Sequence, residues 1–396
     1  MKSLTLTSMQ LRSLVIFRNI LSDPVISRLQ KLLDADSSDT ASCVDAYCDF
    51  AAALFARSDD LSAYLLNLIM EDENIYMLQS CGSKPVSPCL SECLGHEIEF
   101  LQKLGSFDGR TIRESLNFQG FLPSWKNSSP DFASAYRERI ATIHLKGYGI
   151  FAKYRMFTVK DGHLVPVRHP DPQTLDQLPG YEMERSKIIA NTEALLAGKP
   201  ANNVLLYGDA GTGKSSTVKA IVNAYYDKGL RLVEVKKNQL YQIPDITEAL
   251  SRNPLKFILF IDDLSFSSND NDFAALKAIL EGSVNGHSEN FVVYATSNRR
   301  HLIKESWDDR TGSDLHEGDT RQELMSLSAR FGLTVTFFRP DKERYLDIVH
   351  KLAAQYGIDM PQEQLDIRAE AHATRNGGRS PRVAKQFIEL TKAGIK

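Results

Sequence analysis

Short hydrophobic runs alternate with amphipathic helical patterns through the second half of the chain. The runs are rich in β-branched and aromatic residues and are bounded by polar or turn residues. They occupy residues 204–207, 230–235, 257–261, 291–295 and 333–338. Short, mostly apolar runs of this kind are typical of strands buried on both faces. The pattern therefore predicts an α/β fold, with a five-stranded parallel sheet and helices on both faces.

The chain before and after this region has helical patterns. Within residues 1–149, stretches such as 60–69 repeat apolar residues at helical spacing. Beyond residue 340 the same spacing returns. It predicts three helices, at 342–356, 362–374 and 381–393.

Residues 150–172 have a third pattern. β-Branched and aromatic residues surround a turn at 160–163, and a proline-containing stretch follows. This order predicts a hairpin and then a linker. The changes of pattern divide the chain into a mostly helical N-terminal domain (1–149), a hairpin and linker (150–174), a sheet-containing core (175–339) and a small helical C-terminal domain (340–396).

The composition is that of a folded protein with more than one core. The 396 residues are 42% hydrophobic and 24% charged, as in ordinary globular proteins. A chain of this length usually forms two or three domains. The formal net charge of −3 produces no overall field that attracts nucleic acid, so composition neither names nor excludes such a partner.

The cysteines and the hydropathy indicate the compartment. No stretch approaches the roughly 18 uninterrupted apolar residues of a membrane helix. The five cysteines are odd in number and lie in the first quarter of the chain, which does not indicate a disulfide framework. We therefore expect a cytoplasmic protein without membrane association.

A zinc site in the N-terminal domain is an alternative use of these cysteines. Cys89, Cys93 and His96 lie at helix-like spacing, and Cys81 is near in sequence. The spacing lacks the close cysteine pairs of common zinc sites, and buried cysteines are ordinary core residues. The bound metal content of the purified protein distinguishes the two interpretations.

A phosphate-binding loop follows the first of the hydrophobic runs. The motif of one glycine, four residues, then glycine, lysine and serine is matched by Gly208-Asp209-Ala210-Gly211-Thr212-Gly213-Lys214-Ser215. A strand precedes it and a helical pattern follows, which is the context this motif requires. Glycines let backbone N–H groups surround phosphate oxygens, and the start of the helix adds partial positive charge. We expect these eight residues and Ser216 to bind ATP, with Lys214 reaching the β- and γ-phosphates.

Two carboxylates follow the run at 257–261 and indicate a metal site. Mg²⁺ bound to phosphates needs oxygen ligands, and a strand end holds them firmly. We expect Ser215 and Asp262 to hold Mg²⁺. Asp263 is placed to orient or deprotonate the attacking water.

A polar residue also follows the run at 291–295. Asn298 ends a Thr-Ser-Asn sequence. Its amide could hold the attacking water without competing for Mg²⁺. A turn-initiating asparagine is the alternative interpretation.

In this order, the phosphate-binding loop, the Asp-Asp strand end and the Thr-Ser-Asn strand end resemble the AAA+ superfamily of P-loop ATPases. The resemblance covers about residues 175–396 and implies that Asp262 and Asp263 are the Walker B pair and Asn298 the sensor-1 residue. Many members carry glutamate where this chain has Asp263, which puts hydrolysis in more doubt than nucleotide binding. The resemblance also implies that residues 340–396 form a lid over the nucleotide.

The same resemblance gives roles to arginines. Arg330 stands shortly before the fifth strand, where family members carry an arginine that reaches the ATP of a neighbouring subunit. A surface ion pair is the alternative for Arg330, and Arg321 is a second candidate. Arg382 opens the last helix as the sensor-2 arginine does, with Arg379 as the runner-up. An arginine that acts in trans implies self-association into a ring or an open oligomer.

The chain is most similar to an uncharacterised bacterial AAA+ family known only as a domain of unknown function. Four segments carry this resemblance: 202–208, 260–266, 295–302 and 327–332. In that family, the segment that corresponds to Gly180-Tyr181-Glu182 lines the adenine pocket. The family brings no substrate.

The target of the ATPase is left open among three interpretations. These are an oligomeric ATPase that remodels a protein or nucleoprotein, an ATP-gated binding switch with little turnover, and a nucleic-acid-binding loader similar to helicase loaders. Unfoldases of the superfamily carry an aromatic-hydrophobic-glycine loop, but residues 236–244 lack the glycine. We therefore expect Tyr241 to pack beneath this loop rather than to contact a threaded polypeptide, and we expect the N-terminal domain to recruit the target.

Overall fold

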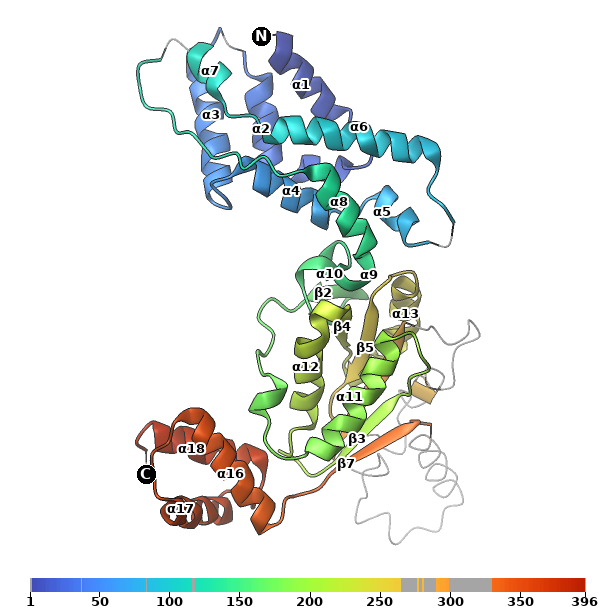
Figure 1. Cartoon of the computed structure of the whole chain (residues 1–396), viewed down its shortest axis with the longest axis vertical. Helices are drawn as coiled ribbons and strands as arrows, with labels where there is room; N and C mark the ends of the chain where they lie inside the picture. Colours follow the sequence, from blue (N-terminus) through green and yellow to red (C-terminus); the bar gives the residue numbers. More distant parts are fainter. Residues whose placement is uncertain are drawn as a thin grey trace. The chain divides into compact units, whose positions relative to one another are not determined.

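The computed structural model describes residues 2–36, 38–82, 84–115, 118–264, 276–277, 280, 290–298 and 330–395. The chain forms two compact units, Met1–Lys153 and Tyr154–Lys396, whose helices and strands are labelled in Figure 1.

The first unit is helical. Its elements are α1 (Lys2–Arg12), η1 (Arg18–Ser22), α2 (Pro24–Asp34), α3 (Thr40–Phe55), α4 (Leu61–Glu71), α5 (Ile75–Ser80), α6 (Pro88–Gly105), α7 (Arg110–Ser115), α8 (Phe132–Ala141), α9 (Ile143–Lys146) and α10 (Ile150–Lys153). Side chains fix where several begin: Asp60 caps α4 by accepting from the Ala63 N–H at 2.9 Å. The apolar faces meet in one hydrophobic core. Within the described residues, no helix is long and apolar enough to cross a membrane.

The cysteines of this unit do not converge on a metal site. In the part of the chain that the structure describes, no group of three or more His, Cys, Asp or Glu side chains is arranged to hold a metal ion. Cys93 on α6 donates instead to Glu97, with an Sγ–Oε1 distance of 3.4 Å. Burial raises the pKa of Cys81 to about 11. The geometry thus favours the interpretation of these residues as ordinary packing and surface cysteines.

The second unit is built on a seven-stranded sheet. The strands are β1 (Met156–Lys160), β2 (His163–Pro166), β3 (Val204–Gly208), β4 (Leu230–Glu234), β5 (Lys256–Ile261), β6 (Phe291–Ser297) and β7 (Leu333–Phe337). Their order is β2-β1-β4-β5-β6-β3-β7. The five strands β3 to β7 are those that the hydrophobic runs predict, and all their pairings are parallel.

The hairpin departs from the expected arrangement in two ways. It begins at Met156 rather than at residue 150, because the short helix α10 forms at Ile150–Lys153. It also extends the sheet: β1 pairs in parallel with β4, while β2 pairs antiparallel with β1. Phe157 is fully buried and Val159 nearly so, so joining the sheet removes apolar side chains from water. The sheet therefore has seven strands instead of five.

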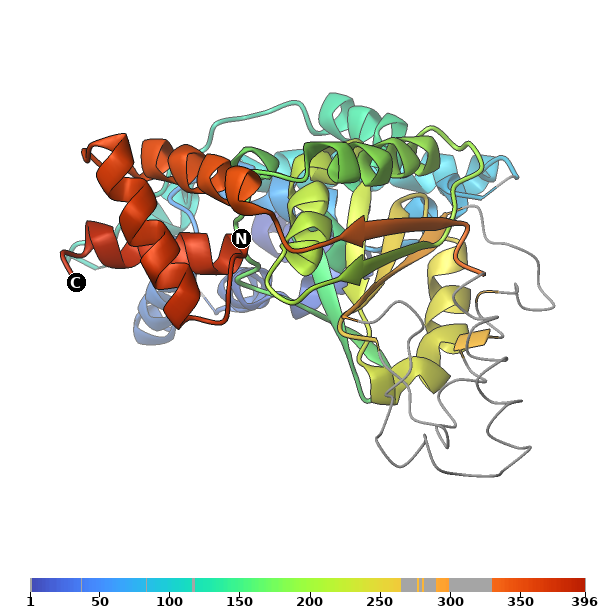
Figure 2. The same cartoon turned by 90° about the horizontal axis from the view of Figure 1, so that it is seen from below.

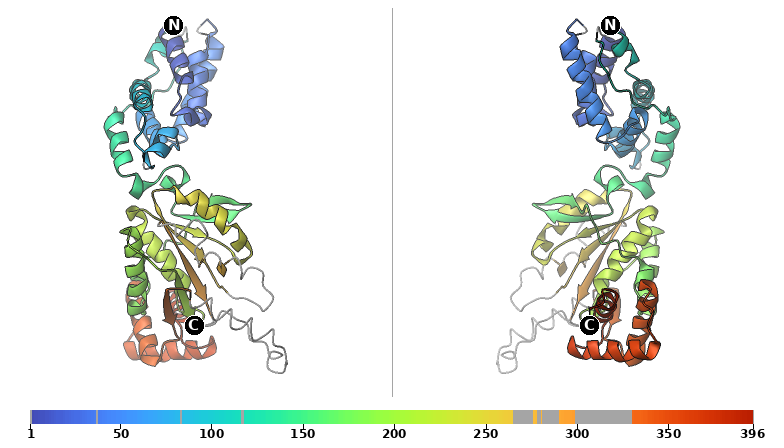
Figure 3. Two further views of the ribbon diagram at one scale, coloured as in Figure 1. Left: turned by 90° about the vertical axis from the view of Figure 1, so that its right-hand side faces the viewer. Right: turned by 90° about the vertical axis from the view of Figure 1, so that its left-hand side faces the viewer.

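The strands β3 to β6 bury side chains on both faces of the sheet. On one face, residues such as Leu206, Ile258 and Tyr294 share a hydrophobic core with α11 (Glu182–Leu196) and α12 (Lys214–Tyr225). Successive strand residues point to opposite faces, so Leu259 and Val293 face the other way, and both are buried. Figure 3 shows α11 and α12 on one side of the sheet and α13 (Ile243–Ser251) on the other.

Tyr241 corrects an expectation. It lies in η4 (Lys237–Gln242) and its side chain is 65% exposed. The neighbouring Leu240 and Ile243 occupy the buried positions instead. The prediction that Tyr241 packs beneath the loop is therefore wrong.

Three helices form the C-terminal lid: α16 (Lys342–Tyr356), α17 (Gln362–Arg375) and α18 (Pro381–Lys392). Each agrees with its expected range to within one residue. Asp341 and Ser380 cap α16 and α18 through their side chains. The lid helices share the hydrophobic core of α11 and the sheet, and Figure 2 shows α16 following the end of β7.

Candidate functional site

The loop between β3 and α12 requires glycine at several positions. Gly208 has φ +135°, and a Cβ added there would lie 2.1 Å from the carbonyl oxygen of Phe337. Gly211 and Gly213 have φ of +77° and +93°, which side chains disfavour. Thr212 closes the loop by donating from Oγ1 to the Asp209 carbonyl at 2.8 Å. The loop therefore presents its backbone at the start of α12, as phosphate binding requires.

The ammonium group of Lys214 lies at the centre of the site. Its Nζ donates to the carbonyls of Gly208 and Asp209, both at 2.8 Å, and to Asn298 Oδ1 at 3.0 Å. The side chain is buried, which lowers the pKa of Lys214, while the nearby aspartates oppose this shift. An ammonium has three N–H donors, so a phosphate oxygen must replace at least one of these partners.

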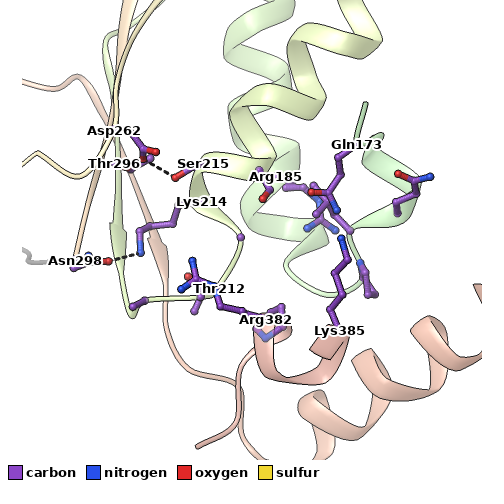
Figure 4. A pocket seen from close by; sticks show the side chains of 18 of the residues that line it. Gln173, Arg185, Thr212, Lys214, Ser215, Asp262, Thr296, Asn298, Arg382 and Lys385 are labelled. Atoms are coloured by element: carbon purple, nitrogen blue, oxygen red, sulfur yellow. Dashed lines mark hydrogen bonds between the residues drawn. The ribbon is translucent and has the colours of Figure 1, made fainter. Parts of the chain in front are cut away.

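Ser215 and Asp262 form an oxygen-rich corner beside this lysine (Figure 4). The Ser215 hydroxyl donates to Asp262 Oδ1 at 2.6 Å, which joins the start of α12 to the end of β5. A hydroxyl and a carboxylate are ligands that suit Mg²⁺. The two residues thus fit the magnesium site that the sequence predicts.

Thr296 contacts both aspartates, a role that the sequence analysis did not assign to it. Its hydroxyl donates to Asp262 Oδ1 at 2.6 Å and accepts from the Asp263 N–H at 2.9 Å. Asp263 has φ +54°, so the second bond supports a backbone conformation that side chains disfavour. Thr296 is only 2% exposed. In sequence it is an ordinary β-branched strand residue.

Asn298 connects the lysine and the second carboxylate. While Oδ1 accepts from Lys214, the amide Nδ2 donates to Asp263 Oδ1 at 3.0 Å. The residues expected to bind phosphate, metal and water are thereby brought into one hydrogen-bonded network. All of them lie at the carboxyl edge of the parallel strands, where ligands of open α/β sheets bind.

The lid meets the loop at Arg382. Its backbone N–H donates to the Gly211 carbonyl at 3.1 Å, and the residue lines the cavity beside the loop. Arg379, the runner-up, instead pairs with Glu370 through two hydrogen bonds of 2.9 and 2.6 Å. The geometry therefore favours Arg382 over Arg379 as a nucleotide contact.

These groups line one cavity of about 510 Å³. The cavity is lined by the phosphate-binding loop and by the strand-end residues Asp262, Asp263, Thr296 and Asn298. The rest of its wall consists of Gln173, Gln177, Leu178, Pro179, Arg185, Leu352, Pro381, Arg382 and Lys385. Tyr181 does not line it, because its ring is in the core with the Arg344 guanidinium 4.1 Å from the ring centre. None of residues 180–182, the expected adenine contacts, lines this cavity, whereas Pro179 and Arg185 on either side of them do.

Arg330 lies away from this cavity. β3 and β7 are parallel, with Val204 opposite Leu333 and Gly208 opposite Phe337. Arg330 precedes the amino end of β7, whereas the phosphate-binding loop follows the carboxyl end of β3. The two are therefore at opposite edges of the sheet. Arg321 lies outside the described residues, as do parts of the segments 260–266, 295–302 and 327–332.

The sheet order, the phosphate-binding loop and the strand-end carboxylates together form a P-loop α/β fold. A family model described as "Protein of unknown function (DUF815)" matches residues 151–395. The chain belongs to this family, in agreement with the sequence-based expectation of an uncharacterised AAA+ family.

Two solved structures are similar to this chain. The RuvB Holliday junction branch migration motor of Thermotoga maritima is 19% identical over 57% of this chain and 67% of its own, with a TM-score of 0.38. The AMPPCP-bound DnaA of Aquifex aeolicus is 18% identical over 55% of this chain and 64% of its own, with a TM-score of 0.39.

Proposed function

We propose that this protein binds ATP with Mg²⁺ and hydrolyses it to ADP and phosphate at a site shared between subunits. The cycle would remodel or load a protein or nucleoprotein target. The observation that carries the proposal is the network from Lys214 through Asn298 to Asp263, beside the Ser215–Asp262 pair. These contacts support the proposal because they join an ammonium, a hydroxyl–carboxylate pair and a second carboxylate at one edge of the sheet.

Each group has a role that its chemistry suits. The loop N–H groups and Lys214 bind the β- and γ-phosphates, and Ser215 with Asp262 holds Mg²⁺. Bound Mg²⁺ would neutralise charge that develops on the phosphate oxygens. Asn298 orients a water molecule, and Asp263 accepts its proton as the water oxygen bonds to the γ-phosphorus. The bond from that phosphorus to the bridging oxygen then breaks and ADP leaves.

An arginine from a second subunit completes the site in this proposal. Arg330 and the phosphate-binding loop are at opposite edges of the sheet, which supports action on a neighbouring chain. Such an arginine stabilises charge on the transferring phosphoryl group. The proposal therefore includes self-association into a ring or an open oligomer.

An ATP-gated switch with little turnover is the second candidate. The observation that favours it is the Asn298 amide, which donates to the Asp263 carboxylate. This hydrogen bond occupies the carboxylate oxygen Oδ1, which is then less available to accept a proton from water. Tight ATP binding without turnover at any protein concentration would support the switch, and salt-sensitive DNA binding would support a nucleic-acid target.

The first test of the proposal is the Lys214→Ala variant. We expect its ATP affinity to fall about 10- to 100-fold, since a hydrogen bond to a charged group contributes about 1.5–3 kcal/mol. Isothermal titration calorimetry with Mg²⁺ and ATP measures this change. Lys219→Ala is a matched control, because Lys219 is on the same helix but pairs with Glu234 at 3.9 Å outside the cavity. Equal affinities for both variants would contradict a phosphate-binding role.

A second test addresses Thr296. We expect Thr296→Val to reduce kcat about tenfold, since the isosteric side chain loses the hydrogen bonds to the Asp262 carboxylate and to the Asp263 backbone N–H. We expect Thr296→Ser, which keeps the hydroxyl, to restore most of this rate. The Mg²⁺ concentration that half-saturates ATP binding should rise for the valine variant alone. Equal defects in the serine and valine variants would instead indicate that only packing matters.

A further inference from the structure

The part of the cavity beyond the phosphate-binding loop is suited to the base and ribose. The loop, Lys214 and the strand-end carboxylates take the triphosphate and Mg²⁺, so the rest of the nucleotide occupies the remaining wall. Leu178, Pro179 and Leu352 supply apolar surface there, as base binding requires. The polar groups at this end come from Gln173, Gln177, Arg185 and Lys385.

Arg185 is the unusual member of this set. It is on α11, is only 7% exposed, and still lines the cavity. Figure 4 shows the side chains of Arg185, Gln173 and Lys385 directed toward one another at the end away from Lys214. Among the described residues, we find no hydrogen bond from the guanidinium.

The nearest carboxylate does not satisfy this arginine. Glu182 lies 4.0 Å from Arg185 Nη2, beyond hydrogen-bond reach, and is 61% exposed. Its own oxygen accepts from the Gly180 N–H at 3.0 Å and lies 3.4 Å from Lys351 Nζ. Arg185 therefore offers N–H groups to the cavity that it lines. A ligand with acceptor atoms at this end of the cavity would accept hydrogen bonds from them.

The donor chemistry indicates which ligand atoms fit. The amides of Gln173 and Gln177 both donate and accept, so they serve any base edge. Arg185 only donates. Purines present N7 as an acceptor, and guanine adds the acceptor O6 beside it, whereas adenine has a donor amino group at that position. The planar guanidinium matches the N7 and O6 pair with two parallel hydrogen bonds.

We propose that Arg185 reads the base of the bound nucleotide and that the site takes purine nucleoside triphosphates, GTP as well as ATP. This inference rests on the proposed function, because the P-loop must hold the triphosphate for the base to reach Arg185. The wild-type protein then binds GTP at least as tightly as ATP. The selectivity between GTP and ATP then depends on Arg185, which belongs neither to the phosphate-binding loop nor to the expected Mg²⁺ ligands Ser215 and Asp262.

The test compares ATP and GTP affinities for wild type, Arg185→Gln and Lys385→Gln, by calorimetry with Mg²⁺. Arg185→Gln is expected to lower the GTP-to-ATP affinity ratio about tenfold or more, because one bidentate pair discriminates by that amount. Lys385→Gln removes the same charge from the same cavity, so it changes both affinities equally. Arg185→Lys keeps the charge without the planar fork and also lowers the ratio. Melting temperatures check that each variant is folded.

The outcomes separate this inference from the proposed function. If wild type binds ATP but excludes GTP, or if Arg185→Gln and Arg185→Lys weaken both nucleotides equally, Arg185 does not read the base and the P-loop proposal stands. If wild type binds neither nucleotide, both proposals fail. A ratio that changes only with Arg185 supports the inference.

Discussion

Asp263→Asn is expected to bind ATP as tightly as wild type and to lose about 10²- to 10⁴-fold in kcat, the range that general-base catalysis contributes. The amide oxygen still accepts from Asn298 Nδ2, but the amide cannot take a proton from water. Asparagine also tolerates the left-handed backbone of position 263, where φ is +54°. Single-turnover hydrolysis together with ATP binding measures the two effects separately.

Asp263→Glu is the matched control for this variant. It keeps a carboxylate on a longer side chain, and we expect it to retain hydrolysis at a measurable rate. If Asp263→Asn and wild type hydrolyse ATP at similar rates, Asp263 is not the base. If neither wild type nor the glutamate variant turns over, the ATP-gated switch becomes the better interpretation.

Most of the sheet could be predicted from the sequence because the strands β3 to β6 are buried on both faces. Such strands are mostly apolar runs, and polar residues follow their ends. The partner of the hairpin could not be predicted, since the pattern of residues 156–166 indicates strands without saying what they pair with. The exposure of Tyr241 was mispredicted for a related reason. Local spacing does not determine which of three neighbouring apolar residues is buried.

The candidate site, like the sheet, could be predicted only in part from the sequence. Lys214, Asp262 and Asn298 belong to motifs or strand ends, and the parallel topology brings strand ends together. Thr296 belongs to the Thr-Ser-Asn strand end, but nothing in the sequence indicates that its hydroxyl contacts both aspartates. Arg185 has no such signal, since it is a helical residue well before the loop. Their places in the cavity depend on tertiary contacts that no local pattern encodes.

Arg330→Ala is expected to reduce ATP turnover by about 10³- to 10⁵-fold with little change in ATP affinity, as for arginines supplied in trans to related P-loop enzymes. The sheet register prevents Arg330 from reaching its own loop, because it precedes β7 while the loop follows β3. Specific activity of the wild type should therefore rise with protein concentration. Arg330→Lys, which keeps the charge but loses the planar fork, should remain strongly impaired.

Mixing two inactive variants tests the shared site directly. Arg330→Ala keeps an intact loop and Asp263, whereas Asp263→Asn keeps the arginine. In an equal mixture, about one quarter of random subunit interfaces pair an intact Asp263 with a neighbour's intact arginine, because each interface contributes different residues from its two sides. The ATPase activity of the mixture should therefore be about one quarter of the wild-type activity, far above that of either variant alone. A mixture as inactive as its components, with activity per subunit independent of concentration, would exclude Arg330 as the residue that completes the site.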